Sequence, residues 1–379
     1  MNPSYSLKDL IIYFLKLGTW GFGGPVALVG YMHRDLVTDK KWIAEEDYKE
    51  GLALSQLAPG PLAAQLAIYI GYVHYHLAGA TLVGLAFVLP SFLMVLAIGY
   101  AYVAYGGLPW MQAVFYGVGA AVIGIIAVSS YKLTTKSIGK DKLLWAIFLI
   151  VAIITFATGQ EILWVILLAG VIVWFVKAPP RWLASQAQAI VPFMLAQIQP
   201  VATESRLWQI AVFFTKAGAF VFGSGLAIVP FLYGGVVTEY RWLNEQQFLD
   251  AVAVAMITPG PVVITVGFIG YLAAGFWGAV VAALATFLPC YLFTVLPAPY
   301  FKKYGKHPAI KAFVDGVTAA AIGAIAGAVF VLGKRTLVDL PALAIALVAI
   351  IILLKFKKLP EPLIIAGAAI LGLTLKLIV

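Results

Sequence analysis

The chain has 379 residues, of which 63% are hydrophobic and only 11% charged, and its mean hydropathy is +0.99. This composition excludes a soluble globule and is typical of an integral membrane protein in a lipid bilayer. The net charge of +9 comes from Lys and Arg in the loops between apolar segments, which favours membrane topology over nucleic-acid binding as its explanation.

Twelve apolar segments follow one another along the chain, each near the ~20 residues that a membrane-crossing helix needs. In chain order they cover 8–30, 50–75, 78–104, 110–131, 143–158, 160–177, 207–231, 248–271, 274–298, 309–333, 338–354 and 360–378. A polar stretch separates the sixth segment from the seventh. It predicts a first membrane repeat over 1–177, a linker over 178–206 and a second membrane repeat over 207–379.

The second half of the chain repeats the first. Between 14–61 and 214–261, fifteen of 48 positions are identical without a gap. The pairing then shifts by one residue and continues from Gly71 with Gly270 to Gly124 with Gly323. Many of the repeated residues are glycines and prolines that interrupt helices. Paired, interrupted apolar segments in two halves of a membrane protein point to the binding site of a transporter.

The basic residues predict the topology. If all twelve segments cross the membrane, Lys and Arg divide 11 against 12 between the two sides, contrary to the positive-inside rule. If 50–75 and 248–271 instead enter and leave on one side as re-entrant hairpins, the inner loops hold 18 and the outer loops 5. We therefore expect an all-α integral membrane protein of the inner (cytoplasmic) membrane. Its two inverted-topology repeats would each have about five transmembrane helices plus a re-entrant P-G-P helical hairpin, with both termini outside.

Two interruptions in each half predict helix ends inside the membrane. Exposed backbone N–H groups and the positive end of the helix dipole bind anions at such ends. An alternative explanation is that the interruptions are kinks for close helix packing. The candidate substrate-binding residues at the breaks are Phe22, Gly23, Gly24, Pro25, Gln56, Pro59, Gly60 and Pro61, with Phe222, Gly223, Ser224, Gly225, Thr258, Pro259, Gly260 and Pro261 in the second half.

Lys16 and Lys216 lie about halfway into the first segment of each half, where a charged side chain is expensive and is a functional candidate. A bound dianion would neutralise both, whereas snorkelling of the long side chains towards the interface is the structural alternative. Arg34 has no basic partner in the second half, since Gly234 stands there. It is a candidate for the mouth of the pathway, or an ordinary positive-inside anchor.

Acidic residues cluster at the start of each hairpin, where carboxylates suit the first turn of a helix. Glu50 and Asp250 are the two candidates for proton coupling among them, although helix capping is the favoured explanation. The four His residues and the single Cys do not form a metal-ligand pattern, and no phosphate-binding nucleotide loop is present. We expect no metal and no other cofactor.

The motifs F-G-G-P (22–25), W-(I/L)-x-E and Q-x-x-P-G-P (56–61) resemble those of the chromate ion transporter family, in its two-domain, duplicated form. They recur in the second half with Ser224-Gly225 in place of Gly24-Pro25, and with Met256 and Thr258 in place of Gln56 and Ala58. The resemblance covers about 7–333. It implies export of chromate, an oxyanion shaped like sulfate, as a resistance function. A substrate at half-helix N-termini near the midplane follows from the breaks themselves.

The sequence thus predicts a secondary transporter that exports chromate or a similar tetrahedral oxyanion. An anion channel and an uptake carrier for sulfate or another oxyanion remain alternatives. A membrane enzyme is the weakest alternative, because no His/Asp/Glu or Ser/His cluster falls within the apolar segments. The oligomeric state is left open, a homodimer included.

Overall fold

The computed structural model describes residues 5–22, 24–105, 109–158, 163–179, 205–220, 228–304, 307–356, 359 and 361–378, and these residues form helices and no strands. Four helical stretches are long and apolar enough to cross a membrane: Leu62–Tyr105, Trp110–Thr135, Val262–Phe301 and Pro308–Lys334. Shorter apolar helices accompany them. The expectation of an all-helical, multi-pass membrane protein therefore agrees with the structure. The predicted linker falls mostly outside the described residues, and the next helix begins at its last residue, Arg206.

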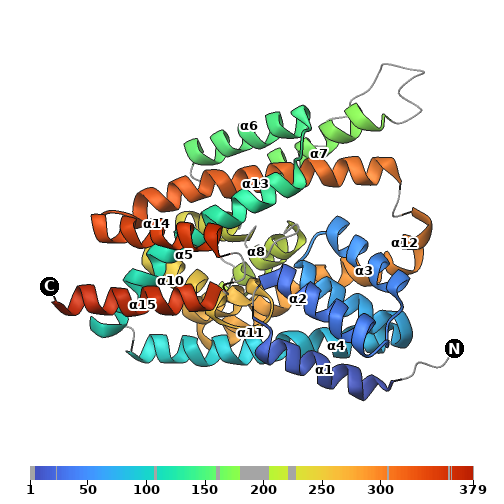
Figure 1. The fold of residues 1–379 in the computed structure, drawn as a ribbon, viewed down its shortest axis with the longest axis horizontal. Helices are drawn as coiled ribbons and strands as arrows, with labels where there is room; N and C mark the ends of the chain where they lie inside the picture. Colours follow the sequence, from blue (N-terminus) through green and yellow to red (C-terminus); the bar gives the residue numbers. More distant parts are fainter. Residues whose placement is uncertain are drawn as a thin grey trace.

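The elements of the first half recur in the second in the same order (Figure 1). The first half holds α1 (Leu7–Trp20), α2 (Gly24–Met32), η1 (His33–Asp39), α3 (Glu45–Leu57), α4 (Leu62–Tyr105), α5 (Pro109–Ser137), α6 (Lys142–Thr158) and α7 (Leu163–Lys177). The second holds α8 (Arg206–Phe220), α9 (Val229–Tyr233), η4 (Gly234–Glu239), α10 (Glu245–Ile257), η5 (Val262–Ile264), α11 (Thr265–Val295), α12 (Ala298–Tyr304), α13 (Pro308–Thr336), α14 (Leu340–Lys355) and α15 (Glu361–Ile378).

The first apolar segment is broken where the sequence predicts a break. Ser6 and Asp9 form a capping box at the start of α1, and the helix ends at Trp20. The next helix, α2, begins at Gly24 with Pro25 in its first turn, a position where the missing N–H of proline costs nothing. Gly24 adopts a left-handed φ of +72°, which a residue with a side chain rarely adopts.

Each P-G-P sequence joins two helices. In the first half, α3 ends at Leu57 and α4 begins at Leu62, and the two pack against each other. In the second half, α10 ends at Ile257 and η5 begins at Val262. The long helix that follows each turn contains a kink. The backbone departs from helical geometry at His76 in α4, and at Ala274 and Gly275 in α11.

Pairs of glycines bring the helical arms on either side of these kinks into close contact. A Cβ added to Gly71 would lie 2.4 Å from the carbonyl oxygen of Gly79, and one added to Gly270 would lie 2.3 Å from that of Gly278. The chain therefore reverses direction at each kink with backbone against backbone. Such a close approach is available only to residues without side chains.

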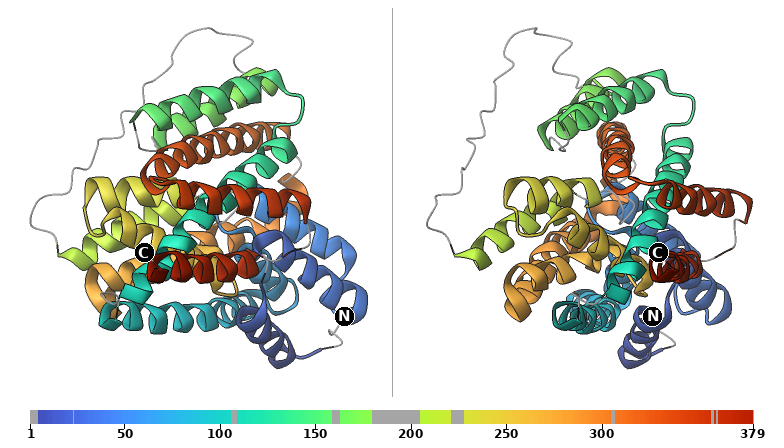
Figure 2. Two further views of the ribbon diagram at one scale, coloured as in Figure 1. Left: turned by 60° about the vertical axis from the view of Figure 1, so that its left-hand side comes forward. Right: turned by 90° about the vertical axis from the view of Figure 1, so that its left-hand side faces the viewer.

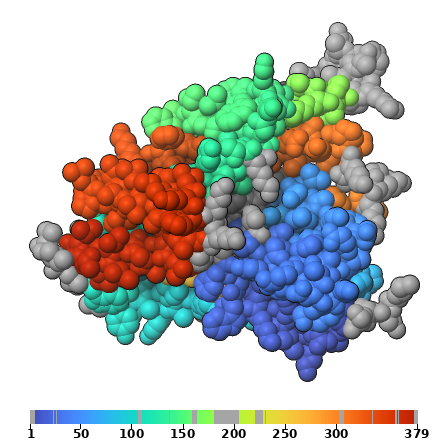
Figure 3. All heavy atoms as spheres, viewed as in Figure 1, coloured from blue at the N-terminus to red at the C-terminus, as the bar shows by residue number. Residues whose placement is uncertain are grey.

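The last helices of each half pack on the other half. Helices α6 and α7 lie along α13, whereas α14 and α15 lie along α5 (Figures 1 and 2). In the space-filling view, α6 and α7 (green) lie on the orange surface of α13 along the top, and α14 and α15 (orange-red to red) lie together at the left (Figure 3). The two halves are therefore interleaved rather than side by side.

Glycines at aligned positions make this interleaving possible. A Cβ added to Gly117 of α5 would lie 2.0 Å from the carbonyl oxygen of Ala368 in α15. Its counterpart Gly316 of α13 stands in the same relation to Ala169 in α7, at 2.6 Å. Helices that approach this closely are held by van der Waals packing, the main attractive force between helices in lipid.

We predict that Gly117→Ala destabilises the protein although alanine favours helices. The new methyl group must push α15 away from α5, and overpacking of this kind costs about 1–3 kcal/mol. Gly367→Ala is the matched control, because a Cβ there meets no atom within 4 Å and gains up to ~1 kcal/mol of helix propensity. Thermal unfolding of the purified protein in detergent should lower the midpoint for Gly117→Ala only. Equal midpoints for the two variants would contradict the close α5–α15 contact.

Candidate functional site

The turn at Thr258–Pro261 between α10 and η5, here called the tip of the second hairpin, contacts the break after α1. The backbone N–H of Gly260 donates a hydrogen bond to the carbonyl oxygen of Gly21, at 3.0 Å. The hydroxyl of Ser91, in the second arm of α4, lies 2.7 Å from the carbonyl oxygen of Pro259 and 3.3 Å from that of Gly18. Gly260 has a φ of +92°, and a Cβ there would lie 2.1 Å from the Ser91 hydroxyl. A hairpin of one half is thus locked into the broken helix of the other.

The remaining residues of this tip are buried. Thr258 is 6% exposed and its hydroxyl donates to the carbonyl oxygen of Val254 in its own helix at 2.6 Å. Pro261 is buried as well and precedes the short helix η5. The Thr258 hydroxyl therefore satisfies a helix-end carbonyl, and the polar group that the tip presents to α1 is the backbone of Gly260.

The tip of the first hairpin is held by an amide side chain that the sequence analysis did not select. Gln65 is fully buried and donates from Nε2 to the carbonyl oxygen of Pro59, at 2.8 Å. Its Oε1 atom is buried without a hydrogen-bond partner among the described residues. Gly60 has a φ of +143° and lies against this amide. Pro61 is buried, whereas Gln56, the predicted site residue, is exposed.

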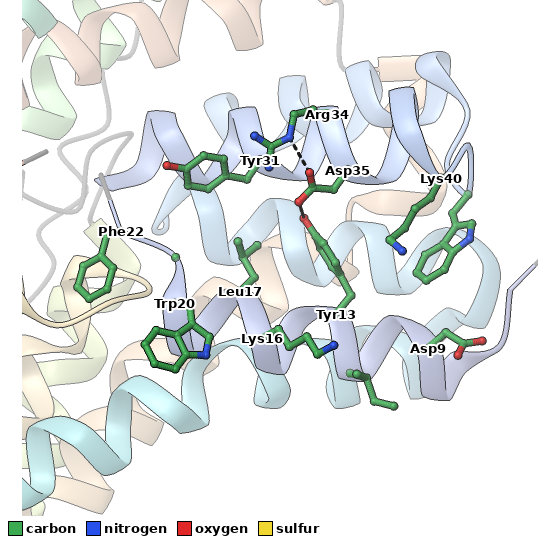
Figure 4. A pocket seen from close by; sticks show the side chains of 13 residues that line it. Asp9, Tyr13, Lys16, Leu17, Trp20, Phe22, Tyr31, Arg34, Asp35 and Lys40 are labelled. Carbon is green, nitrogen blue, oxygen red and sulfur yellow. Dashed lines mark hydrogen bonds and ion pairs between the residues drawn. The ribbon is translucent and has the colours of Figure 1, made fainter. Parts of the chain in front are cut away.

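A cleft lined by charged, aromatic and aliphatic side chains runs along α1 and opens beside its break (Figure 4). Its volume is about 790 Å³. It is lined by residues of α1, of the break, and of α2 and the π-helical segment η1 with the loop that follows: Asp9, Ile12, Tyr13, Lys16, Leu17, Trp20, Gly21, Phe22, Tyr31, Arg34, Asp35, Lys40 and Trp42. Since Gly21 lines the cleft and also binds Gly260, the cleft ends at the tip of the second hairpin.

The two acidic residues of the cleft have local partners. Nε of Arg34 donates to Asp35 at 2.8 Å, and the hydroxyl of Tyr13 donates to the same carboxylate at 3.2 Å. Asp9 receives hydrogen bonds from the backbone and side chain of Ser6 as part of the α1 cap. Lys16 is exposed in the cleft, and it makes no ion pair with any residue that the structure describes.

A repeated glutamate holds the segment that carries Arg34 against α3. In the first half, Glu45 pairs with Nε2 of His33 at 2.9 Å and with Lys49 at 3.1 Å, and these contacts hold the pKa of Glu45 below its ordinary value. In the second half, Glu245 accepts from Tyr233, which aligns with His33. The shared W-x-x-E motif therefore has a structural role, because its glutamate joins η1 to α3 in the first half and the end of α9 to α10 in the second.

Glu50 and Asp250 lie on the hairpins but not at their tips. Asp250 is 2% exposed and accepts hydrogen bonds from Tyr102 at 2.7 Å and from Gln246 at 2.8 Å. Glu50 is half-buried in α3. Each stands eight residues before the turn, about 12 Å along a helix. The Tyr102 contact joins α10 to α4 and gives Asp250 a structural partner.

The structure brings together some predicted site residues and not others. Lys16, Phe22 and Arg34 share the cleft. Gly260 meets the α1 break, and Pro259 beside it accepts a hydrogen bond from Ser91. Gly24 and Pro25 begin α2, and Lys216 is exposed on α8. Five predicted site residues lie outside the part of the chain that the structure describes: Gly23, Phe222, Gly223, Ser224 and Gly225. Among the described residues, His, Cys, Asp and Glu do not gather in groups of three or more that would hold a metal ion.

Three contact residues were missed: Gly21, Gln65 and Ser91. Gln65 is the one amide side chain in the apolar segment 50–75 beyond the P-G-P turn, which is a usable signal. Ser91 follows Pro90, but nothing local indicates that it reaches the other half of the chain. Gly21 is the first residue of the G-F-G-G-P run whose later members were selected.

These features define a multi-pass helical membrane protein with broken helices that meet polar side chains. The family model described as Chromate transporter matches residues 8–174 and 208–373. The chain therefore belongs to the chromate transporter family, as its repeated motifs indicated.

Its relatives include transport proteins that match it along almost their full length. It is 71% identical over 375 residues to the chromate transport protein of Cupriavidus metallidurans, covering 98% of this chain and 94% of that protein. It is 64% identical to the probable chromate transport protein of Synechococcus elongatus (98% and 96%), and 29% identical to the chromate transport protein of Pseudomonas aeruginosa (91% and 85%). No solved structure matches the chain.

We predict that Gly260→Ala lowers stability through its contact with Ser91. The left-handed backbone costs about 1–2 kcal/mol for a residue with a side chain, and the clash adds about 1–3 kcal/mol. Gly275→Ala is the control, since Gly275 is also left-handed (φ +63°) but a Cβ there meets nothing within 4 Å. The double variant Gly260→Ala/Ser91→Ala should recover part of the loss. Thermal unfolding in detergent measures all three, and equal losses for Gly260→Ala and Gly275→Ala would contradict the interlock.

Proposed function

We propose that this protein is a secondary transporter that exports chromate, or a similar tetrahedral dianion, across the cytoplasmic membrane. The observation that carries the proposal is the 71% identity, over 98% of the chain, to a protein named chromate transport protein. The described geometry supports a carrier, because broken helices meet at a cleft that carries cationic side chains.

The topology that we propose has two inverted repeats and both termini outside. The uneven distribution of Lys and Arg supports it, with 18 in inner loops and 5 in outer loops when α3 and α10 belong to re-entrant hairpins. An inverted repeat places the two hairpins on opposite sides of the membrane, with their tips near the middle. Backbone outside regular helices is tolerated at that depth only where protein or a water-filled cavity surrounds it.

The substrate in this proposal passes between the cleft and the tip of the second hairpin. The N–H of Gly260 now donates to the carbonyl of Gly21, and an incoming oxyanion would replace that carbonyl as the acceptor. The start of η5 follows directly, so its free N–H groups and the positive end of the helix dipole add to the attraction. The interlock then closes the pathway in one state and opens in another, as alternating access requires.

The inverted topology can be tested at two aligned, exposed positions. Asp39 is the last residue of η1, and Glu239 is its counterpart at the end of η4. In a Cys290→Ser background, Glu239→Cys should react with a membrane-impermeant maleimide in intact cells, whereas Asp39→Cys should react only after permeabilisation. Reaction of both from the same side would remove the inverted repeat. The buried Cys290 makes the background variant a control for unspecific labelling.

We predict electrogenic efflux. A dianion that leaves an inside-negative cell releases about 2.3 kcal/mol per charge and 100 mV, hence about 4.6 kcal/mol in all, so export needs no coupling ion. Glu50→Gln and Asp250→Asn should leave potential-driven transport largely intact, and Asn can still accept the hydrogen bond from Tyr102. The measurement is chromate flux in proteoliposomes at a valinomycin-clamped potential and equal pH. Flux that ignores the potential and follows a pH gradient or a counter-anion would indicate electroneutral exchange.

A further inference from the structure

The charged lining of the cleft along α1 is not matched at the aligned, described positions of the second half, apart from Lys216. Lys16 aligns with Lys216, but the other ionisable residues that line the cleft are replaced in the second half. Arg34, Asp35 and Lys40 of the first half are replaced by Gly234, Gly235 and Tyr240. The duplication therefore kept one cationic side chain and lost the charged groups that surround it.

Aromatic rings fill the space in the second half. Phe213, which aligns with Tyr13, stacks on Phe231 with ring centroids 5.2 Å apart. It also meets Tyr240 and Trp242 edge to face, each at 5.7 Å. A Cβ added to Gly235 would lie 2.0 Å from the Phe213 ring, so this ring occupies the place where Asp35 carries its carboxylate in the first half. Among the described residues of the second half, packed aromatic rings therefore stand where the first half has the charged side chains of the cleft.

The first-half cleft carries a net positive charge, since three cationic side chains face two carboxylates: Lys16, Arg34 and Lys40 against Asp9 and Asp35. Both carboxylates are engaged, Asp35 by Arg34 and Tyr13, and Asp9 by the cap of α1. Arg34 uses Nε for Asp35, and its two terminal nitrogens make no hydrogen bond among the described residues. Lys16 makes no ion pair with any described residue, and Figure 4 places it on α1 between Trp20 and Tyr13, whereas Arg34 extends from η1 on the other side of the cleft.

We propose that this cleft is an oxyanion-binding site of the first half alone, in which Lys16 and Arg34 hold a tetrahedral dianion before it reaches the hairpin tip. The guanidinium supplies a fork of donors that matches two oxygens, and the ammonium supplies a compact charge. Lys40, over the ring of Trp42 at 4.7 Å, places a third positive charge at the other end of the cleft. Lys216 is not part of a binding site, in contrast to the symmetric role that the sequence suggests.

The site deepens the proposed export function and rests on it for direction: a dianion captured here is next to Gly21 and Phe22, and hence next to the N–H of Gly260. The volume of about 790 Å³ leaves room for the ion together with water. The same chemistry would also suit the phosphate of a lipid headgroup. The experiment must therefore separate a free oxyanion from a lipid.

The test measures oxyanion binding to the purified full-length protein in uncharged detergent, by equilibrium dialysis with labelled sulfate and with chromate. Loss of a charge-assisted contact costs about 1.5–3 kcal/mol, so Lys16→Met and Arg34→Gln should each weaken binding by about tenfold or more. Lys216→Met, the same change at the aligned exposed position, should leave binding within about twofold of the wild type. Arg34→Lys should restore part of the affinity because it keeps the charge.

Equal weakening by Lys16→Met and Lys216→Met overturns the asymmetric site, and so does a wild-type protein that binds neither anion. A second arm adds phosphatidylglycerol to the detergent. Displacement of sulfate only by the lipid, with no competition between chromate and sulfate, identifies a headgroup site and also overturns the proposal. Flux in proteoliposomes is read separately. If the wild-type protein transports chromate but both Lys variants lose binding equally, the export function stands and the asymmetric site fails. If binding is asymmetric but the wild-type protein shows no flux, the site stands and the export function fails.

Discussion

Broken helices in a membrane must find hydrogen-bond partners within the protein, and this requirement organises the structure around the hairpin tips. Where α1 ends, the carbonyl of Gly21 is satisfied by the N–H of Gly260. Ser91 covers the carbonyl of Pro259, and Gln65 covers that of Pro59. Two of these three bonds connect different halves of the chain. The halves are therefore held in register by the same groups that would otherwise be left without a partner.

These hydrogen bonds are individually modest, since the net contribution of one such bond is about 0.5–1.5 kcal/mol. Their weakness suits the transport cycle proposed above, in which the contact between tip and break would open and close again. The bulk of the attraction lies elsewhere, in helix pairs whose backbones touch at glycines such as Gly117 and Gly316. A rigid scaffold of tightly packed helices can thus surround a contact between tip and break that is easy to exchange.

Much of the local structure follows from the sequence. Gly and Pro mark the end of α1, the start of α2 and both hairpin turns, because these residues have local conformational requirements. The contact between the second tip and the α1 break could not be predicted in detail, since Ser91 and Gly21 are far from Gly260 in the chain. The cleft could not be predicted either, because its shape depends on how α2 and η1 pack beside α1. Lys16 and Lys216 look equivalent in the alignment, but Lys16 shares a cleft with charged side chains, whereas Phe213, the counterpart of Tyr13, packs among aromatic rings in the second half.

The exchange of helices between the halves bears on how the protein is made. Helices α6 and α7 enter the bilayer long before their packing surface on α13 has been synthesised, so they must be stable in lipid alone. Their sequences meet this demand, because no charged residue occurs in 143–158 or in 163–176. Insertion and assembly are thus separate stages for the first half, as in the two-stage description of membrane proteins. Its final packing waits for the ribosome to complete the second half.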